Sequence, residues 1–247
     1  RLAEEDHARY LDFWREFGGV LKEGIAEDPA SRDRLARLLR FVTTRGGDVQ
    51  EHSLQDYVAR MPAGQKHIYY VTADTVSRAR SSPHLEALRT CGVEVLLLPD
   101  RIDEWMVAHL GEFDGHELRD VARGALDLDA LATPDEVLAS RAAATDIEPV
   151  CQRLAAVLGP RVAAVRASQR LADSAACLVR AEHEPGPQLR RLLESAGQTV
   201  PASAPTLDVT FEVIEPRLGT RVLGDRMSGR WTLTAPTGTV NLNIDNL

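Results

Sequence analysis

The chain contains 247 residues with a formal net charge of −8, and 44% of its residues are hydrophobic. This size and composition can supply the core of one large domain or two modest ones. The acidic balance argues against general binding to a nucleic-acid backbone. No apolar run approaches the roughly 20 residues that span a bilayer. Cys91, Cys151 and Cys177 are far apart and form no CxxC pair, which predicts reduced, mostly buried thiols in a cytosolic protein.

The first 50 residues of the sequence carry two helical patterns. An apolar stripe over residues 2–17 predicts a helix that ends at the glycine pair 18–19. Asp28 and Pro29 predict the start of a second helix, which the glycine pair 46–47 would end. Its apolar face would consist of Leu35, Leu38, Leu39 and Val42.

Residues 66–106 carry the clearest pattern of the chain. Two short apolar runs, residues 68–71 and 93–98, do not alternate with polar residues, as expected of strands that are covered on both faces. Residues 75–81 and 83–91 between them have helical character, and an N-capping serine followed by proline opens the second of these segments. A strand, a helical crossover and a second strand form the unit that builds a parallel sheet.

Further elements flank this unit on both sides. Before it, Ser53 and Asp56 have the spacing of a capping box and predict a helix that ends at Pro62. After it, residues 101–110 place apolar side chains at helical spacing, and residues 116–121 suggest a further strand.

The second half of the chain has weaker signals. Residues 124–133 favour neither helix nor strand, and we place a domain boundary there. A Thr-Pro-Asp-Glu sequence at residues 133–136 predicts the start of a helix that runs to residue 159, with a kink or a restart at Pro149. The remaining elements are strands at residues 161–168 and 176–180, joined by a polar turn, and a short helix at residues 187–196.

From residue 211 onward, apolar and polar residues alternate between Gly and Pro positions, which is typical of β-hairpins. The predicted fold class is therefore α/β, and α+β over the whole chain. We expect a three-layer helix-sheet-helix unit with a short parallel sheet, a smaller α+β domain and a β-like tail. The predicted divisions are residues 1–45, 46–124, 125–210 and 211–247.

Several blocks of sequence resemble one known family. They include SLQDYVARMPAGQKHIYYVTAD, SSPHLEALRTCGVEVLLLPDRIDEW and LGEFDG, in that order along the chain. This stretch is similar to the middle domain of the ninety-kilodalton heat-shock chaperone family, bacterial HtpG type. The resemblance extends over about residues 2–209 and implies the second half of a middle domain followed by part of a C-terminal domain.

The resemblance implies a dimeric clamp that ATP opens and closes and that holds partly folded client proteins. In the family, ATP and Mg bind to an N-terminal domain, and the arginine that reaches the ATP phosphate precedes Leu2. We therefore carry over no catalytic residue and expect no ATP hydrolysis by this chain alone, which we interpret as a fragment or a truncated gene product. The family's C-terminal dimerisation helices have no counterpart in the tail, so a homodimer is in doubt. We expect a cytoplasmic location and no nucleic-acid or membrane partner.

The candidate client-binding residues come from two helical segments. Trp105 and Met106, with Glu104 beside them, belong to the first, and either large side chain could be core or an exposed adhesive surface. The second segment contributes Leu189, Leu192 and Leu193, with Arg190 and Arg191 on its other face. The resemblance implies that both segments face a cleft that holds clients.

Two other classes of function remain open at this point. The turns after the two strands lack the glycines of a phosphate-binding loop, and the histidines show no metal-ligand spacing. Asp100, Asp103 and Glu104 are interpreted as carboxylates at a helix start, where they cap the helix and interact favourably with the dipole at its N-terminus. One alternative is a small-molecule enzyme that uses Asp74 and Asp100 at the strand ends, which would require a polar pocket and a raised carboxylate pKa there. The other is an inactive structural relic.

Overall fold

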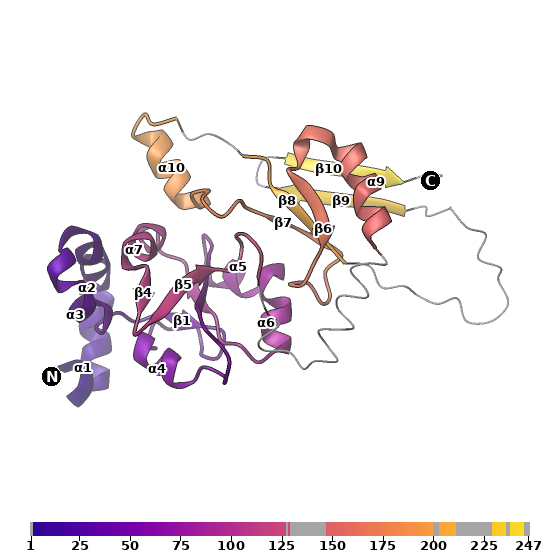
Figure 1. The fold of residues 1–247 in the computed structure, drawn as a ribbon. Helices are drawn as coiled ribbons and strands as arrows, with labels where there is room; N and C mark the ends of the chain where they lie inside the picture. The colour runs from indigo at the N-terminus through magenta and orange to yellow at the C-terminus, as the bar shows by residue number, and fades with distance from the viewer. Residues whose placement is uncertain are drawn as a thin grey trace. The chain divides into compact units, whose positions relative to one another are not determined.

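A computed structural model of the chain describes residues 2–126, 128, 147–199, 203–210, 229–235 and 238–244 (Figure 1). The chain divides into two compact units, Arg1–Thr210 and Phe211–Leu247, and each is described by itself. In the part of the chain that the structure describes, no helix combines the length and the apolar character needed to cross a membrane. The predicted helix start at residues 133–136 lies outside the described residues.

The N-terminal helices differ from the sequence prediction at the first glycine pair. After α1 (Leu2–Glu5), α2 extends over His7–Glu27 and passes through both glycines. Gly18 lies under the indole of Trp14, and a Cβ there would come within 2.8 Å of that ring. The expected end of the helix at residues 18–19 is therefore wrong, because the first glycine makes room for a packed side chain.

The second predicted helix is also too long. Asp28 caps a short 3₁₀ turn, Pro29–Ser31, through bonds from the N–H groups of the following residues, and α3 (Arg32–Ala36) ends soon after. Val42 instead belongs to β1 (Val42–Thr43), where it pairs with Leu97 at the edge of the sheet. Pairing with a strand more than 50 residues away overrides the local helical pattern.

A five-stranded sheet forms the centre of the first unit, in the order β1-β3-β2-β5-β4. The central strand β2 (Ile68–Thr72) pairs in parallel with β3 (Leu96–Leu98) and with β5 (His116–Asp120), which confirms the expected parallel unit. The edge strands β1 and β4 (Glu112–Phe113) pair antiparallel, so the complete sheet is mixed rather than purely parallel.

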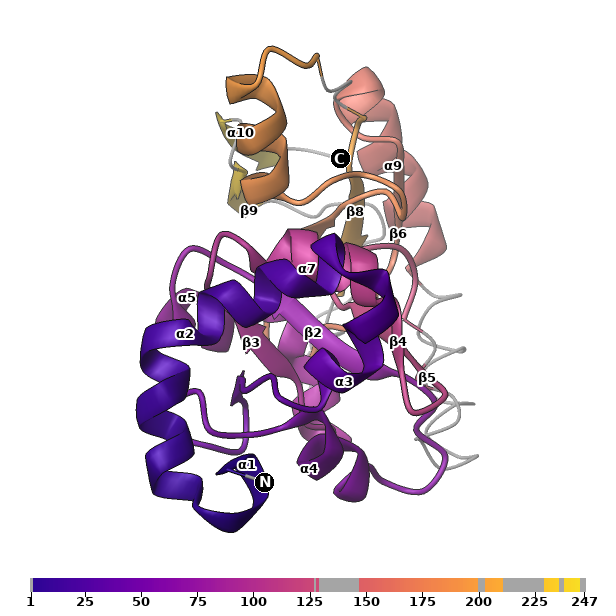
Figure 2. The same ribbon diagram turned by 90° about the vertical axis from the view of Figure 1, so that its left-hand side faces the viewer.

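Successive residues of the central strands point to opposite faces and enter two hydrophobic clusters. Ile68 and Tyr70 pack in a cluster with residues of α2, α4 (Leu54–Ala59) and α7 (Asp103–Leu110). Tyr69 and Val71 pack in the other cluster, with residues of α5 (Val76–Arg80) and α6 (Glu86–Thr90). In Figure 2, α2 crosses in front of α7, against which it packs.

Most predicted helix ends of this region are confirmed. Ser53 and Asp56 form the reciprocal capping box at the start of α4. Ser82 caps a 3₁₀ turn, Pro83–Leu85, and Gly92 has a φ of +67° just after α6. These helix ends were predictable from the sequence because each depends only on residues within one helical turn.

Among the described residues after β5, the first unit contains the helices α9 and α10 and a three-stranded sheet. Helix α9 (Glu148–Leu158) carries Pro149 in its first turn, which agrees with a helix start at this proline, while the segment expected to precede it lies outside the described residues. The sheet order is β6-β8-β7. We predicted β6 (Ala164–Ala167) and β7 (Ala176–Val179) but not the central strand that separates them, β8 (Thr206–Val209). Helix α10 (Pro187–Ser195) precedes β8 and is followed by Gly197 with a φ of +78°.

The second unit contains an antiparallel pair, β9 (Gly229–Ala235) and β10 (Gly238–Ile244). The alternation of apolar and polar residues in this segment correctly predicted a hairpin.

Candidate functional site

Helix α7 carries three of the predicted site residues, and the structure separates them by burial. Met106 is 0% exposed and packs in the core beneath the central sheet, whereas Trp105 is 39% exposed. The Trp105 ring lies on His109, with a centroid distance of 4.4 Å, and the His109 Nδ1 is 2.8 Å from the Trp105 carbonyl oxygen. The indole is therefore presented by a rigid helix and supported by a neighbour one turn later.

Glu104 is buried and holds the beginning of a different helix. Its carboxylate accepts hydrogen bonds from the backbone N–H groups of Leu189 at 2.7 Å and Gln188 at 3.3 Å, which lie in the first turn of α10. A carboxylate at this position satisfies free N–H groups and interacts favourably with the helix dipole. Gly186, just before α10, approaches the same carboxylate so closely that a Cβ would overlap it.

Two side chains of α10 attach it to the carboxyl end of β2. Gln188 Nε2 donates a hydrogen bond to the carbonyl oxygen of Ala73 at 3.1 Å. Arg191 lies 3.3 Å from a carboxylate oxygen of Asp74, and that carboxylate also pairs with Arg78 at 2.9 Å. Segments that are about 85 to 117 residues apart in sequence thus form one surface.

The apolar positions of α10 are only partly accessible. Leu189 and Leu193 are half-buried, and the side chain of Leu192 lies outside the described set. Arg190 pairs with Glu184, and Arg191 is largely exposed. The helix therefore combines a partly covered apolar side with a basic side, as the sequence indicated.

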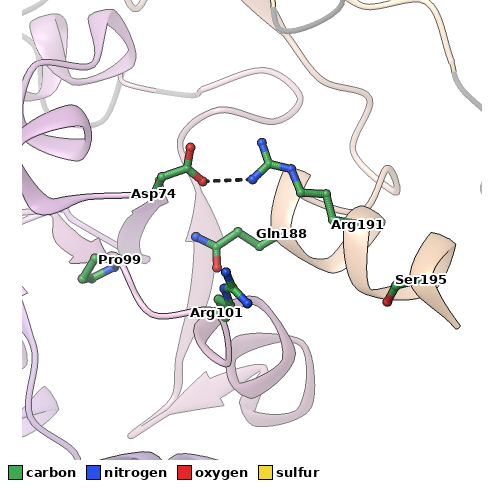
Figure 3. Close-up of a pocket in the computed structure, with 6 residues that line it drawn as sticks. All are labelled: Asp74, Pro99, Arg101, Gln188, Arg191 and Ser195. Carbon is green, nitrogen blue, oxygen red and sulfur yellow. Dashed lines mark hydrogen bonds and ion pairs between the residues drawn. The ribbon is translucent and has the colours of Figure 1, made fainter.

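A pocket of about 530 Å³ lies between α10 and the loops that follow β2 and β3. Its lining residues are Asp74, Pro99, Arg101, Gln188, Arg191 and Ser195 (Figure 3). Figure 3 shows Arg191 and Asp74 joined across it, with the first three residues on one side and the three residues of α10 on the other. The sequence predicted that Asp74 lies at this edge of the sheet, but it did not predict that α10 packs beside it.

The carboxylates after β3 are used for packing. The Lys22 ammonium lies 2.6 Å from Asp100 and 2.7 Å from Asp103, and Gln50 donates a hydrogen bond to Asp100 at 3.0 Å. Burial alone would lower the pKa of Lys22, but the two carboxylates raise it above its usual value. Burial raises the pKa of Asp103, whereas Lys22 more than offsets burial at Asp100 and lowers the pKa of that carboxyl.

The predicted capping role of these carboxylates therefore needs correction. Ile102 is the N-cap residue of α7 and makes no side-chain cap, while Asp103 accepts a hydrogen bond from the N–H of Asp100 at 2.9 Å. Glu104 caps α10 instead of its own helix. Within the described residues, no group of three or more His, Cys, Asp or Glu side chains has an arrangement that could hold a metal ion.

Comparison with known proteins identifies the family to which the chain belongs. A family described as "Hsp90 protein" matches residues 1–213 of the chain. The chain belongs to the Hsp90 family. The protein named "Chaperone protein HtpG" of Halorhodospira halophila is 50% identical over 236 residues, which cover 94% of this chain and 37% of that protein.

Other HtpG chaperones match over a slightly shorter stretch. That of Bordetella avium is 50% identical over 212 residues, which cover 85% of this chain and 34% of that protein. That of Methylibium petroleiphilum is 51% identical over 211 residues, with coverages of 84% and 33%. The Hsp90-family chain thus spans about a third of the length of these relatives.

The comparisons confirm the resemblance to the chaperone family and extend it. An alignment that covers 94% of the chain must include part of the segment after residue 213, so the expected end of the resemblance near residue 209 is too early for the Halorhodospira halophila protein. The alternative of a small-molecule enzyme is not favoured. A pocket is present at the strand ends, but Asp100 is held by Lys22 with a lowered pKa, and Asp74 pairs with two arginines.

Proposed function

We propose that this chain contributes a client-binding surface to an HtpG-type chaperone and that this surface consists of Trp105 and the apolar side of α10. The observation that carries the proposal is the attachment of α10 to Glu104, the residue next to the exposed indole. This attachment, together with the contacts of Gln188 with Ala73 and of Arg191 with Asp74, fixes α10 beside α7.

The chemistry of these side chains suits loosely folded polypeptides. An exposed tryptophan supplies a large contact area with little loss of side-chain entropy, and leucines on a short helix add an adaptable apolar surface. Met106 cannot contribute in this conformation because its side chain lies in the core. Its role is to fix α7, so that Trp105 points away from the sheet.

The client-binding role of the chain is separate from ATP chemistry in this proposal. We assign ATP binding and hydrolysis to the two-thirds of the HtpG relatives that the chain does not span. The chain would then bind clients with modest affinity and without nucleotide, and the longer protein would couple that binding to clamp movement.

The test is suppression of aggregation of chemically denatured malate dehydrogenase by the full 247-residue chain. We expect the double variant Trp105→Ser, Leu193→Ser to lose more than half of the suppression. The matched control is Phe17→Ser, because Phe17 is an aromatic residue that is 51% exposed on α2. Circular dichroism establishes that each variant is folded. Equal suppression by the folded double variant and the unchanged chain would overturn the proposal.

A further inference from the structure

The pocket beside α10 contains an arginine whose charge is not matched. Arg101 is exposed at the pocket wall and has no ion-pair or hydrogen-bond partner among the residues that the structure describes. Asp74, the one carboxylate among the lining residues that the structure describes, pairs with Arg78 and Arg191. The pocket is therefore locally basic, although the chain as a whole carries a charge of −8.

The same pocket contains a hydrogen-bond acceptor that is not used. Gln188 Nε2 donates to the carbonyl oxygen of Ala73, which fixes the orientation of the amide, because a carbonyl cannot donate to a flipped oxygen. The remaining Oε1 atom is buried and has no hydrogen-bond partner within the described part of the chain. A buried acceptor of this kind is costly unless a ligand or water donates to it.

A ligand that satisfies both groups must combine a donor with an anion. A peptide residue with an acidic side chain has both, since its backbone N–H can donate to Gln188 Oε1 and its carboxylate can pair with the Arg101 guanidinium. A free carboxylate ion offers the anion but no donor, whereas inorganic phosphate offers both through its P–OH group and is therefore the competitor from which a peptide must be distinguished. Pro99 adds an apolar wall to the pocket, which suits a polypeptide chain.

We propose that this pocket binds an acidic side chain of an extended polypeptide and so gives the neighbouring apolar surface a preference for segments that contain Asp or Glu. The inference rests on the proposed client-binding function and names a chemical preference of its substrate. Trp105 and α10 would supply most of the affinity, and the pocket would select among apolar segments by charge.

The test uses a fluorescein-labelled, acetylated and amidated peptide with one central Glu between apolar residues, and a twin with Gln at that position. Fluorescence polarisation with the full chain measures both affinities. We expect the Glu peptide to bind roughly three- to tenfold more tightly than its twin, as a single charge-assisted hydrogen bond allows. Added salt should reduce this ratio and leave the Gln peptide almost unaffected.

Two substitutions locate the preference. Arg101→Gln should bind the Glu and Gln peptides with equal affinity. Arg101→Glu should bind a third peptide, with Lys at the central position, more tightly than the Glu peptide. The control Arg15→Gln removes the same charge from an exposed position of α2 that does not line the pocket, and it should leave the ratio unchanged.

The outcomes separate this inference from the function on which it depends. If neither peptide binds, the proposed function fails as well. If both bind with equal affinity, or if Arg15→Gln changes the ratio as much as Arg101→Gln does, only the acidic preference is overturned. Competition by inorganic phosphate as effective as that by the Glu peptide would also overturn it, because a general anion site would explain the result.

Discussion

The ammonium group of Lys22 lies 2.7 Å from the carboxylate of Asp103, and neither side chain is more than 1% exposed. This pair joins α2 to the start of α7, the helix that presents Trp105. A buried pair contributes little compared with a well-packed apolar pair, but the loss of one partner leaves an uncompensated buried charge.

We therefore expect Lys22→Met to destabilise the fold by about 3–5 kcal/mol, which urea unfolding would measure. The double variant Lys22→Met, Asp103→Leu should recover most of the loss, because it removes the two fully buried charges and keeps the volume apolar. The third member of the cluster, Asp100, would keep its charge, but its side chain is 43% exposed and still accepts a hydrogen bond from Gln50. Arg15→Gln on the exposed side of α2 is the control and should change stability by less than about 0.5 kcal/mol. A double variant that is as unstable as the single one would contradict this account.

A second carboxylate holds a loop of the later part of the first unit. Glu86 on α6 accepts hydrogen bonds from the backbone N–H groups of Ala172 and Asp173, both at 2.9 Å, and of Ser174 at 3.0 Å. The Ser174 hydroxyl also donates to it. Burial alone would raise the pKa of Glu86, but these donors lower it to about 2.

The pH dependence follows from the direction of this shift. A carboxyl whose pKa is lower in the folded state stabilises the fold fully above its unfolded value of 4.5, and the contribution declines as the pH falls toward about 2. Glu86→Gln should therefore be less stable than the unchanged chain at pH 7, and the difference should shrink at pH 3. The midpoints of urea unfolding at the two pH values measure this difference in stability. The exposed Glu112→Gln should show no such dependence, and an equal deficit at both pH values would refute the role of ionised Glu86.

Local signals in the sequence were enough for most of the first unit. The capping box of Ser53 and Asp56 and the cap at Ser82 each involve residues within three positions of one another, so the chain fixes them before tertiary packing. The central strands were also predictable, because an apolar run that is buried on both faces looks the same in any parallel sheet.

The elements that sequence analysis missed depend on distant partners. Strand β1 exists because Val42 pairs with Leu97, and β8 lies between two strands that precede it in the chain. One pattern in the sequence does predict that Lys22 is buried. Tyr10, Trp14, Gly18 and Lys22 recur at intervals of four along one face of α2, so a lysine in that stripe needs an acidic partner. The sequence does not reveal which carboxylate that is.

The cysteines provide a test of the core around the second sheet. Burial raises the pKa of the Cys177 thiol to about 12, and burial also raises that of Cys151, while Cys91 is partly exposed. Because the thiolate is the reactive form, we expect DTNB to modify Cys91 first and the other two only with unfolding. Cys91→Ser should remove the fast phase. A fast phase that persists in this variant would show that Cys151 or Cys177 is accessible in the folded chain.

The attachment of α10 can be broken from either side. Glu104→Ala removes the carboxylate that accepts the N–H groups of Gln188 and Leu189, and Gly186→Ala introduces a Cβ that overlaps the same carboxylate. Both variants should increase amide hydrogen exchange in α10 while β2 and β3 keep their protection, because the central sheet does not depend on this helix.

Glu104→Gln separates charge from hydrogen bonding in this contact. The amide oxygen can still accept a hydrogen bond, but it lacks the charge that favours the N-terminus of a helix, so exchange in α10 should be intermediate between that of the unchanged chain and that of Glu104→Ala. If exchange in α10 stayed the same in all three variants, Glu104 would not hold the helix. The contact on which the proposed client-binding surface rests would then be overturned, and the contacts of Gln188 with Ala73 and of Arg191 with Asp74 would have to hold α10 in its place.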